Sequence, residues 1–350
     1  MLEGRATPTG TARFEAASGA APGHFRPAPG GLRLSSLGIG TYLGRDDAQT
    51  DALYADAVRR ALNLGINVID SAINYRNQRS ERAVGAALRE SGLDRDQVFV
   101  CTKGGYLPFD GGRPADVRAY FEETYLRPGI LAADEIVAGC HALSPRYLED
   151  QIERSRRNLG LASIDLYYVH NPETQLGGVP RAEFHRRLRR SFEALERACE
   201  GGRIGGYGAA TWSCLRLEPA EEEYLSLDEL LEAARDAGGE GHHFRAVQLP
   251  FNLEMDEAAT LRNQGGRTLL EAAREAGIAV FSSASVLQGR LAQQLPQTVR
   301  HAYAGLASDA QRALQFARST PGITCALVGM KTRAHVEDNA ALAKVAPLGV

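Results

Sequence analysis

From residue 32 onward, short apolar runs alternate with longer segments of helical period, and this alternation limits the possible folds more than any other feature of the sequence. Several runs are rich in Val, Ile, Phe and Tyr and lack strict polar alternation, as is typical of parallel strands covered on both faces. The runs span residues 34–40, 68–70, 98–103, 165–170, 204–209, 246–251, 278–282 and 323–329.

Each apolar run is followed by a segment in which apolar residues recur at helical spacing. These segments fall at residues 55–62, 81–89, 145–159, 192–199, 227–234, 269–276, 308–317 and 335–343. Alternating strands and helices predict a parallel sheet. Eight units in one chain favour a closed barrel, because closure leaves no edge strand to protect. We therefore predict an α/β protein with a single-domain (β/α)8 TIM barrel over residues 32–350.

An open, doubly wound dinucleotide-binding sheet is the alternative architecture. It requires a G-x-G-x-x-G fingerprint at an early junction between a strand and a helix. Gly38-Ile39-Gly40 begins such a fingerprint, but Leu43 stands where the third glycine is needed. The sequence therefore favours the barrel.

Two segments extend the minimal barrel. Residues 1–31 form a Gly/Ala/Pro-rich lead-in that we expect to be partly flexible, with Arg13-Phe14 pairing with residues 24–26 as a small hairpin. Residues 104–143 form an insertion after the third strand, where a connection usually takes only about 2–6 residues. Loops of that size are often lids or binding elements, so we expect the insertion to help close the substrate pocket.

The bulk composition excludes several classes of partner. Lys+Arg 40 against Asp+Glu 43 gives a net charge of -3, so no basic footprint for nucleic acid is present. No apolar stretch approaches the roughly 20 residues needed to cross a membrane. The five cysteines lack paired spacing, and no metal-ligand spacing occurs, which predicts reduced thiols, a cytoplasmic protein and no metal site. The expected partner is a small molecule.

Polar side chains stand where the predicted strands end. Asp70 ends the second strand, with Tyr75 five residues later, while Lys103 and His170 end the third and fourth strands. The active sites of parallel barrels gather at the carboxyl ends of the strands, so we expect these four side chains to meet at one rim.

These residue types suit proton transfer to a carbonyl oxygen that gains negative charge. A phenol has an ordinary pKa near ~10, so it is protonated at neutral pH and can donate. A neighbouring ammonium lowers the pKa of the phenol by favouring the phenolate. A carboxylate can hold the ammonium in place, and an imidazole can orient the carbonyl. The sequence thus indicates general acid catalysis.

Four separated motifs together resemble the aldo-keto reductase superfamily. The motifs are Gly38-Ile39-Gly40-Thr41, the run Gly65-Ile66-Asn67-Val68-Ile69-Asp70-Ser71-Ala72 with Tyr75 and Ser80-Glu81, then Thr102-Lys103, and the run from Ile164 to His170. The resemblance implies that Tyr75 is the general acid and base and that Lys103 tunes it. It also implies that Asp70 pairs with Lys103 and that His170 orients the substrate.

The resemblance further implies a nicotinamide dinucleotide lying across the mouth of the barrel, with NADP(H) favoured and NAD(H) possible. Gln248 matches a glutamine that contacts the carboxamide. In the last segment, Lys331 and His335 would lie near the 2′-phosphate, with Asp338 and Asn339 facing the adenine. The remaining cofactor residues are expected to be Gly40, Thr41, Thr211, Phe281 and Gly329.

Two positions in the cofactor site depart from the family pattern. Ala210-Thr211 replaces the usual Ser-Asn after the fifth strand, which leaves Thr211 to offer one hydroxyl. Phe281 or a neighbour would have to stack on the nicotinamide where many relatives have tyrosine.

The predicted function is reversible, NAD(P)H-dependent reduction of an aldehyde or ketone, possibly a sugar, to an alcohol. Tyr42, Tyr106 and Trp212 are the candidate walls of the substrate pocket. Two alternatives use the same fold. One is a non-catalytic, cofactor-sensing partner subunit, and the other is an aldolase in which Lys103 forms a Schiff base.

Overall fold

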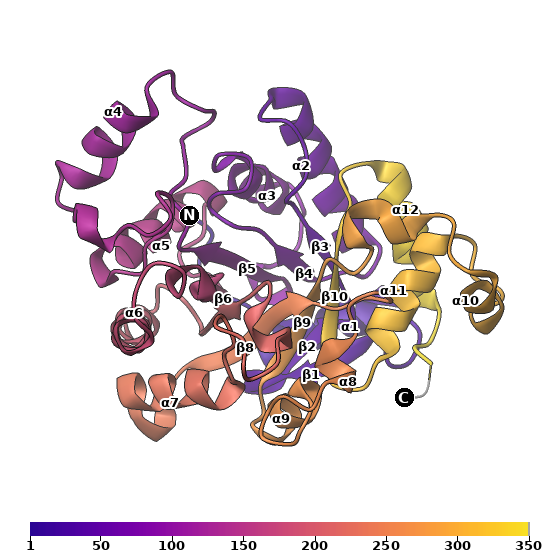
Figure 1. Ribbon diagram of the computed structural model, residues 1–350. Helices are drawn as coiled ribbons and strands as arrows, with labels where there is room; N and C mark the ends of the chain where they lie inside the picture. The colour runs from indigo at the N-terminus through magenta and orange to yellow at the C-terminus, as the bar shows by residue number, and fades with distance from the viewer. Residues whose placement is uncertain (349–350) are drawn as a thin grey trace.

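The computed structural model describes residues 1–348 and places a closed parallel barrel at the centre of the molecule (Figure 1). The strands are hydrogen-bonded in the order β10-β3-β4-β5-β6-β7-β8-β9. Their bounds are β3 Leu37–Gly40, β4 Val68–Asp70, β5 Phe99–Gly104, β6 Leu166–His170, β7 Tyr207–Ala210, β8 Phe244–Pro250, β9 Ala279–Ser283 and β10 Ile323–Gly329. The predicted (β/α)8 barrel is confirmed.

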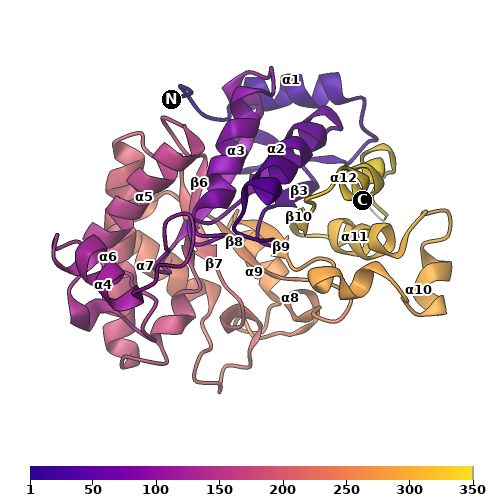
Figure 2. The same ribbon diagram turned by 90° about the horizontal axis from the view of Figure 1, so that it is seen from above.

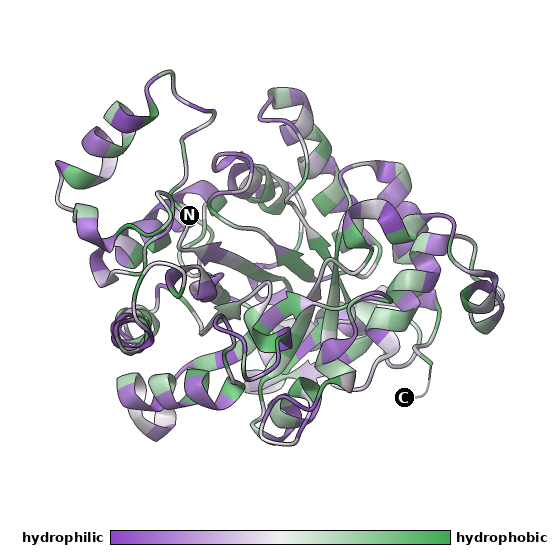
Figure 3. Ribbon diagram, viewed as in Figure 1, coloured by the Kyte–Doolittle hydropathy of each residue, from purple (hydrophilic) through white to green (hydrophobic). Residues whose placement is uncertain are grey.

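A helix follows every barrel strand and packs on the outside of the barrel (Figures 1 and 2). These helices are α2 Ala48–Asn63, α3 Arg79–Arg89, α5 Pro145–Leu159, α6 Arg181–Glu200, α7 Leu227–Gly238, α9 Leu269–Glu275, α11 Asp309–Ser319 and α12 Arg333–Ala340. Three shorter helices lie in the connections: α4 Val117–Phe121, α8 Glu257–Thr260 and α10 Gln297–Ala302. Figure 3 shows strands that are mostly apolar and helices that alternate between apolar and polar residues, as burial between two layers requires.

The N-terminal segment folds differently from the predicted hairpin. Arg13 and Phe14 lie in helix α1 (Pro8–Ser18), which starts where the Thr7 side chain accepts a hydrogen bond from the Gly10 N–H. Strand β1 (Phe25–Ala28) pairs instead with β2 (Leu32–Ser35). The predicted pairing of residues 13–14 with residues 24–26 is therefore wrong, because the Thr-Pro capping sequence begins a helix there.

The expected first strand, residues 34–40, is divided into two. Its first half belongs to β2 of the hairpin, and its second half forms β3 of the barrel. The hairpin therefore spans the predicted boundary at residue 31, and Phe14 of α1 contacts Phe25 of β1 with ring centroids 6.0 Å apart.

The insertion at residues 104–143 forms a small unit on the outer surface of the barrel. Figure 1 shows α4 at the upper left, on the α5 side of the molecule and away from α11 and α12. Tyr125 packs on Tyr147 of α5 with ring centroids 5.7 Å apart, and Arg82 of α3 pairs with Asp110. The insertion therefore has an aromatic core of its own.

Among residues 1–348, no helix is long and apolar enough to cross a membrane. Nor does this part of the chain contain a group of three or more His, Cys, Asp or Glu side chains that could hold a metal ion.

Candidate active site

A buried ion pair joins two neighbouring strands of the barrel. Asp70 ends β4 and Lys103 lies near the end of β5, and both side chains are almost fully buried. The Lys103 Nζ donates to Asp70 Oδ2 at 2.6 Å and to the carbonyl oxygen of Ser71 at 2.8 Å. Gln248 of β8 donates through Nε2 to the other oxygen of Asp70 at 2.9 Å. The Asp70 carboxylate is thus held from two sides of the barrel.

Tyr75 stands above this pair in the turn between β4 and α3. The Lys103 Nζ lies 4.9 Å from the centroid of the Tyr75 ring. The three residues after Tyr75 all have positive φ, from 48° at Arg76 to 72° at Gln78. Such a run of left-handed residues is costly, and buried contacts must support it. Arg76 provides one, because its guanidinium donates to Asp51 at 2.6 Å.

The pKa values in this cluster depend on two opposing effects, burial and charge. Burial raises the pKa of Tyr75, and the ammonium of Lys103 acts in the opposite direction. Burial lowers the pKa of Lys103, but Asp70 and Tyr75 outweigh that effect and raise it to about 12. The ammonium therefore stays charged at neutral pH. The expectation that Lys103 favours the phenolate form of Tyr75 has the right sign, although burial of the phenol dominates.

His170 ends β6 and faces Tyr75. The two ring centroids are 5.9 Å apart, and Tyr106 lies 5.1 Å from His170 on another side. Burial lowers the pKa of His170 well below its ordinary value, with Lys103 and His141 adding to the effect. Its Nδ1 is buried without a hydrogen-bond partner among the described residues. A neutral imidazole therefore lies beside Tyr75, where it can meet a substrate oxygen.

A chain of hydrogen bonds runs from Arg187 of helix α6 to the main-chain carbonyl of His170. Arg187 donates to Gln175 Oε1 at 3.0 Å, which fixes the orientation of that amide. The Gln175 amide then donates to His141 Nδ1 at 2.9 Å, and His141 Nε2 donates to the carbonyl oxygen of His170 at 2.8 Å. Each donor meets an acceptor only if His141 is neutral. The sequence analysis missed His141, which ends the insertion.

Acid should destabilise the protein through His141. Burial lowers the pKa of His141 from its usual 6.5 to about 4, so between these values the unfolded chain binds a proton that the folded chain does not. Stability therefore falls as pH drops through this window. Between about pH 7 and about pH 5, the wild type should lose about 2 kcal/mol more unfolding free energy than His141→Gln. Urea titrations at both pH values measure the difference.

His301→Gln is the matched control, because His301 is exposed on α10. It should behave as the wild type does. Equal acid sensitivity in the wild type and His141→Gln would show that His141 is not held neutral.

The upper cavity, which we define by its position at the carboxyl ends of the barrel strands, has a volume of about 640 Å³. Residues at or near the carboxyl ends of every barrel strand except β5 line it, as the location of active sites in this fold requires. From the predicted site it contains Gly40, Thr41, Tyr42, Asp70, Tyr75, Tyr106, His170, Thr211, Trp212, Gln248, Gly329, Lys331, His335, Asp338 and Asn339. Lys103 adjoins it beneath Asp70.

Phe281 is the one predicted cofactor residue that lies elsewhere. It is 1% exposed, stacks on Phe99 with ring centroids 6.2 Å apart, and lines a second cavity at the opposite end of the barrel. Ser283, two residues later on β9, reaches the upper cavity instead. Because side chains alternate and each residue advances the strand by about 3.3 Å, Phe281 lies one layer too deep to stack on a ligand there. The prediction for Phe281 is wrong.

At the far end of the upper cavity, two predicted adenine contacts differ in their hydrogen bonding. The Asp338 carboxylate already accepts bonds from Ser308 at 2.6 Å and from Gln311 at 2.9 Å. The Oδ1 of Asn339 is buried without a partner among the described residues. Asn339 is therefore the better candidate for a direct contact, and Asp338 is held as part of the wall.

The predicted substrate-pocket residues form part of the cavity wall near Tyr75, but most of the insertion does not. Tyr42 lies 4.9 Å from Tyr75 between ring centroids, and Trp212 is 46% exposed at the rim. From the insertion, only Tyr106 lines the cavity, so the expectation that the insertion closes the pocket is wrong for the rest of it. The insertion instead packs on α3 and α5, because its aromatic residues find partners there.

Sequence analysis also missed some residues that do line the cavity. Asn171 adopts a φ of 45° directly after β6, and its amide donates to the Tyr106 hydroxyl at 3.2 Å. The end of β9 contributes Ser283, and the segment after it contributes Ala284, Ser285, Val286, Gln288, Gly289 and Ala292. In the sequence, a run of small residues directly after a predicted strand is the pattern that could have indicated this part of the cavity wall.

With this geometry established, comparison with known families decides the classification. The model of the aldo/keto reductase family matches residues 36–349. The chain belongs to the aldo/keto reductase family. The resemblance drawn from the separated motifs is thereby confirmed.

Individual relatives of this aldo/keto reductase are distant and only partly aligned. It is 36% identical over 141 residues to a 9,11-endoperoxide prostaglandin H2 reductase of Trypanosoma cruzi, a match that covers 40% of this chain and 35% of that protein. It is 25% identical over 191 residues to a putative voltage-gated potassium channel subunit beta of Schizosaccharomyces pombe, covering 54% and 45%. The chain therefore spans less than half the length of these curated relatives.

Solved structures of other family members share the fold of this aldo/keto reductase. The holo form of an aldo-keto reductase from Bacillus halodurans has a TM-score of 0.65 at 19% identity, covering 93% of this chain and 92% of that one. An aldo/keto reductase from Klebsiella pneumoniae in complex with NADP and acetate has a TM-score of 0.63 at 21% identity, with the same coverage of both chains. At these identities the likeness shows the barrel architecture.

Proposed function

We propose that this aldo/keto reductase catalyses the reversible reduction of an aldehyde or ketone to an alcohol with NADP(H), using Tyr75 as the general acid and base. One observation carries the proposal: a phenol lies beside a charged ammonium in the wall of a cavity that holds the other predicted site residues. Family membership supports oxidoreductase chemistry on carbonyl compounds.

In this proposal each residue of the cluster has a separate task. A nicotinamide dinucleotide supplies or accepts the hydride. Tyr75 gives its phenolic proton to the substrate oxygen in reduction and takes it back in oxidation, and Lys103 stabilises the phenolate left behind. Asp70 holds Lys103 in place through the 2.6 Å ion pair. His170, which lines the cavity beside Tyr75, orients the carbonyl.

The residues of the upper cavity fit a dinucleotide. The cavity reaches from Tyr75 to Asn339, whose buried Oδ1 lacks a partner among the described residues. The side-chain amide nitrogen of Gln248 donates to Asp70. The side-chain oxygen of Gln248 can then accept a hydrogen bond from the carboxamide N–H of the cofactor. Thr332 caps α12 by accepting from the His335 N–H, so Lys331 stands just before a helix N-terminus, where an anion is favoured.

Lys331 should select the phosphorylated cofactor. Lys331→Ala is expected to raise the KM for NADPH by about tenfold while changing the KM for NADH little, because a charge-assisted bond to the 2′-phosphate is lost. Initial rates with each cofactor give both values. Lys344→Ala is the control, since Lys344 bonds the carbonyl oxygens of Ser18 and Gly19, outside the cavity. Equal losses with NADPH and NADH would place the 2′-phosphate elsewhere.

The direct test of the proposed function follows cofactor absorbance with a panel of aldehydes, ketones and sugars, running NADPH and NADH in parallel. Turnover of at least one carbonyl class with NADPH is the expected result. Binding of NADPH without turnover across the panel would favour the alternative of a cofactor-sensing subunit. The relative named as a potassium channel subunit beta makes that outcome worth resolving.

The Schiff-base aldolase is disfavoured on physical grounds. Such a mechanism needs a neutral amine as nucleophile. The pKa of Lys103 is instead raised to about 12, and its Nζ is engaged by Asp70 and the Ser71 carbonyl. We also propose a cytoplasmic location, in keeping with the free state of all five cysteines.

A further inference from the structure

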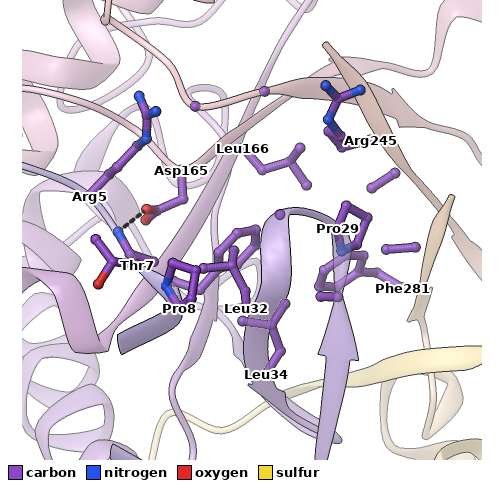
Figure 4. Close-up of a pocket in the computed structure, with 18 residues that line it drawn as sticks. Arg5, Thr7, Pro8, Pro29, Leu32, Leu34, Asp165, Leu166, Arg245 and Phe281 are labelled. Atoms are coloured by element: carbon purple, nitrogen blue, oxygen red, sulfur yellow. Dashed lines mark hydrogen bonds between the residues drawn. The ribbon is translucent and has the colours of Figure 1, made fainter. Parts of the chain in front are cut away.

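A second cavity, which we call the lower cavity, lies at the opposite end of the barrel from Tyr75. Its volume is about 270 Å³. Its lining comes from the N-terminal segment at residues 5–8, from the hairpin β1–β2, and from barrel strands near their amino ends (Figure 4). None of the residues that line the upper cavity lines this one.

One wall of the lower cavity is apolar. Leu32 and Leu34 of β2 face Leu166 of β6 and Phe281 of β9, and the ring of Phe99 stacks on Phe281 (Figure 4). An apolar cavity of about 150 Å³ is enough to hold benzene. The lower cavity therefore has room for an apolar body somewhat larger than a benzene ring.

Two arginines stand along one edge of this cavity. Figure 4 shows Arg5 at one end of this edge and Arg245 at the other. They flank a pair of adjacent glycines. A Cβ on Gly205 would lie 3.1 Å from Cδ of Arg5, and a Cβ on Gly206 would lie 3.1 Å from Cγ of Arg245. The absence of side chains on the glycines therefore lets each arginine stem pack closely against the backbone of its own glycine at the cavity edge.

Neither arginine is neutralised by a carboxylate among residues 1–348. Arg245 donates through Nη1 to the carbonyl oxygens of His242 and Phe244, and Arg5 makes no side-chain hydrogen bond in this part of the chain. The one carboxylate in the lining is Asp165. Its oxygens are taken by Arg95 at 2.5 Å, by the Val100 N–H and by the Ala6 N–H. The cavity edge thus carries uncompensated positive charge.

We propose that the lower cavity is a binding site for a small amphipathic carboxylate. The apolar body of the ligand lies among the leucines and phenylalanines, and its carboxylate lies at the cavity edge that carries Arg5 and Arg245. Guanidinium groups bind carboxylates through charge-assisted, planar hydrogen bonds, and an apolar tail gains free energy as it leaves water. Because the ligand contacts the N-terminal segment, the hairpin and four barrel strands together, its binding stabilises the folded chain.

Octanoate is the probe for this site, with 1-octanol as its neutral match. Calorimetric titration of the full chain should show saturable octanoate binding and much weaker binding of octanol. The binding should weaken as salt is added, because exposed charges are screened. Trp212, the single tryptophan of the chain, lies at the upper cavity, so its fluorescence should not change on binding.

Two kinds of variant locate the binding. Arg5→Gln together with Arg245→Gln should weaken octanoate binding by about tenfold or more. Ala279→Leu, which fills part of the lower cavity, should abolish it. Arg190→Gln removes one positive charge from the exposed surface of α6 and should leave binding unchanged.

Four results would overturn the proposal. These are no octanoate binding, equal binding of octanoate and octanol, octanoate binding that quenches Trp212, and binding that survives both Ala279→Leu and the double arginine substitution. The first shows that the lower cavity takes no such ligand. Equal binding of octanoate and octanol would show that the arginines do not recognise the carboxylate. Quenching of Trp212, or binding that survives the substitutions, would show that octanoate binds outside the lower cavity.

Discussion

Replacing Tyr75 by phenylalanine is expected to lower kcat by roughly 10²- to 10⁴-fold while NADPH still binds with nearly unchanged affinity. The substitution deletes one oxygen and keeps the ring, so its contacts with Tyr42 and His170 remain. Only the transferable proton disappears, and a group that acts in the transition state alone affects kcat rather than binding. Initial rates and NADPH fluorescence titration together measure both quantities.

Tyr42→Phe is the matched control for this substitution. The Tyr42 ring lies 4.9 Å from that of Tyr75 and lines the same cavity, but Tyr42 is 54% exposed and far less constrained. It should retain most of the activity. A Tyr75→Phe variant that keeps more than about a tenth of the wild-type kcat would refute general acid catalysis by this phenol.

Replacing Lys103 by methionine is expected to destabilise the fold by about 3–5 kcal/mol as well as to remove activity. Asp70 would keep a buried charge with no opposite charge beside it, since it is 4% exposed and its other bond comes from the neutral Gln248. Because the pKa of Lys103 is raised to about 12, this contribution is present at neutral pH and is lost only as pH rises toward that value. Urea denaturation at neutral pH measures the loss.

A double substitution separates the buried charge from the packing of the lysine stem. Asp70→Asn with Lys103→Met removes both charges and should recover part of the lost stability without restoring turnover. Arg82→Met is the surface control. Its pair with Asp110 is about half exposed, so the change should stay within about 1 kcal/mol. If Lys103→Met proved as mild as Arg82→Met, the buried pair would not contribute as proposed.

Much of the candidate site could be predicted because it depends on local sequence. Asp70, Lys103 and His170 all stand at the ends of apolar runs, and parallel strands bring their carboxyl ends to one rim. The turn after β4 is equally local, since Tyr75 follows Asp70 by five residues. Asp70, Tyr75 and His170 therefore line the upper cavity, and Lys103 adjoins it beneath Asp70.

The sequence-based predictions were wrong, or missed a residue, where the local sequence allows several arrangements and long-range packing selects one of them. Phe281 and Ser283 lie on the same strand, and only the depth of β9 in the barrel decides which one reaches the upper cavity. The insertion carries enough aromatic residues to form a lid or a surface unit, and its contacts with Tyr147 decide for the surface. His141 also had no local signal, because its role depends on its hydrogen bond to the His170 carbonyl.

The sequence by itself determined the number and order of the barrel strands and of the helices that follow them, the closed barrel, and the rim where the polar residues gather. These follow from hydrophobic periodicity and strand ends, which act over a few residues. Only the tertiary structure decided the depth of each side chain in the barrel, the outward packing of the insertion and the cavity beneath the N-terminal hairpin. Those features depend on contacts between residues far apart in the chain, and several arrangements of equal local preference compete until packing chooses one.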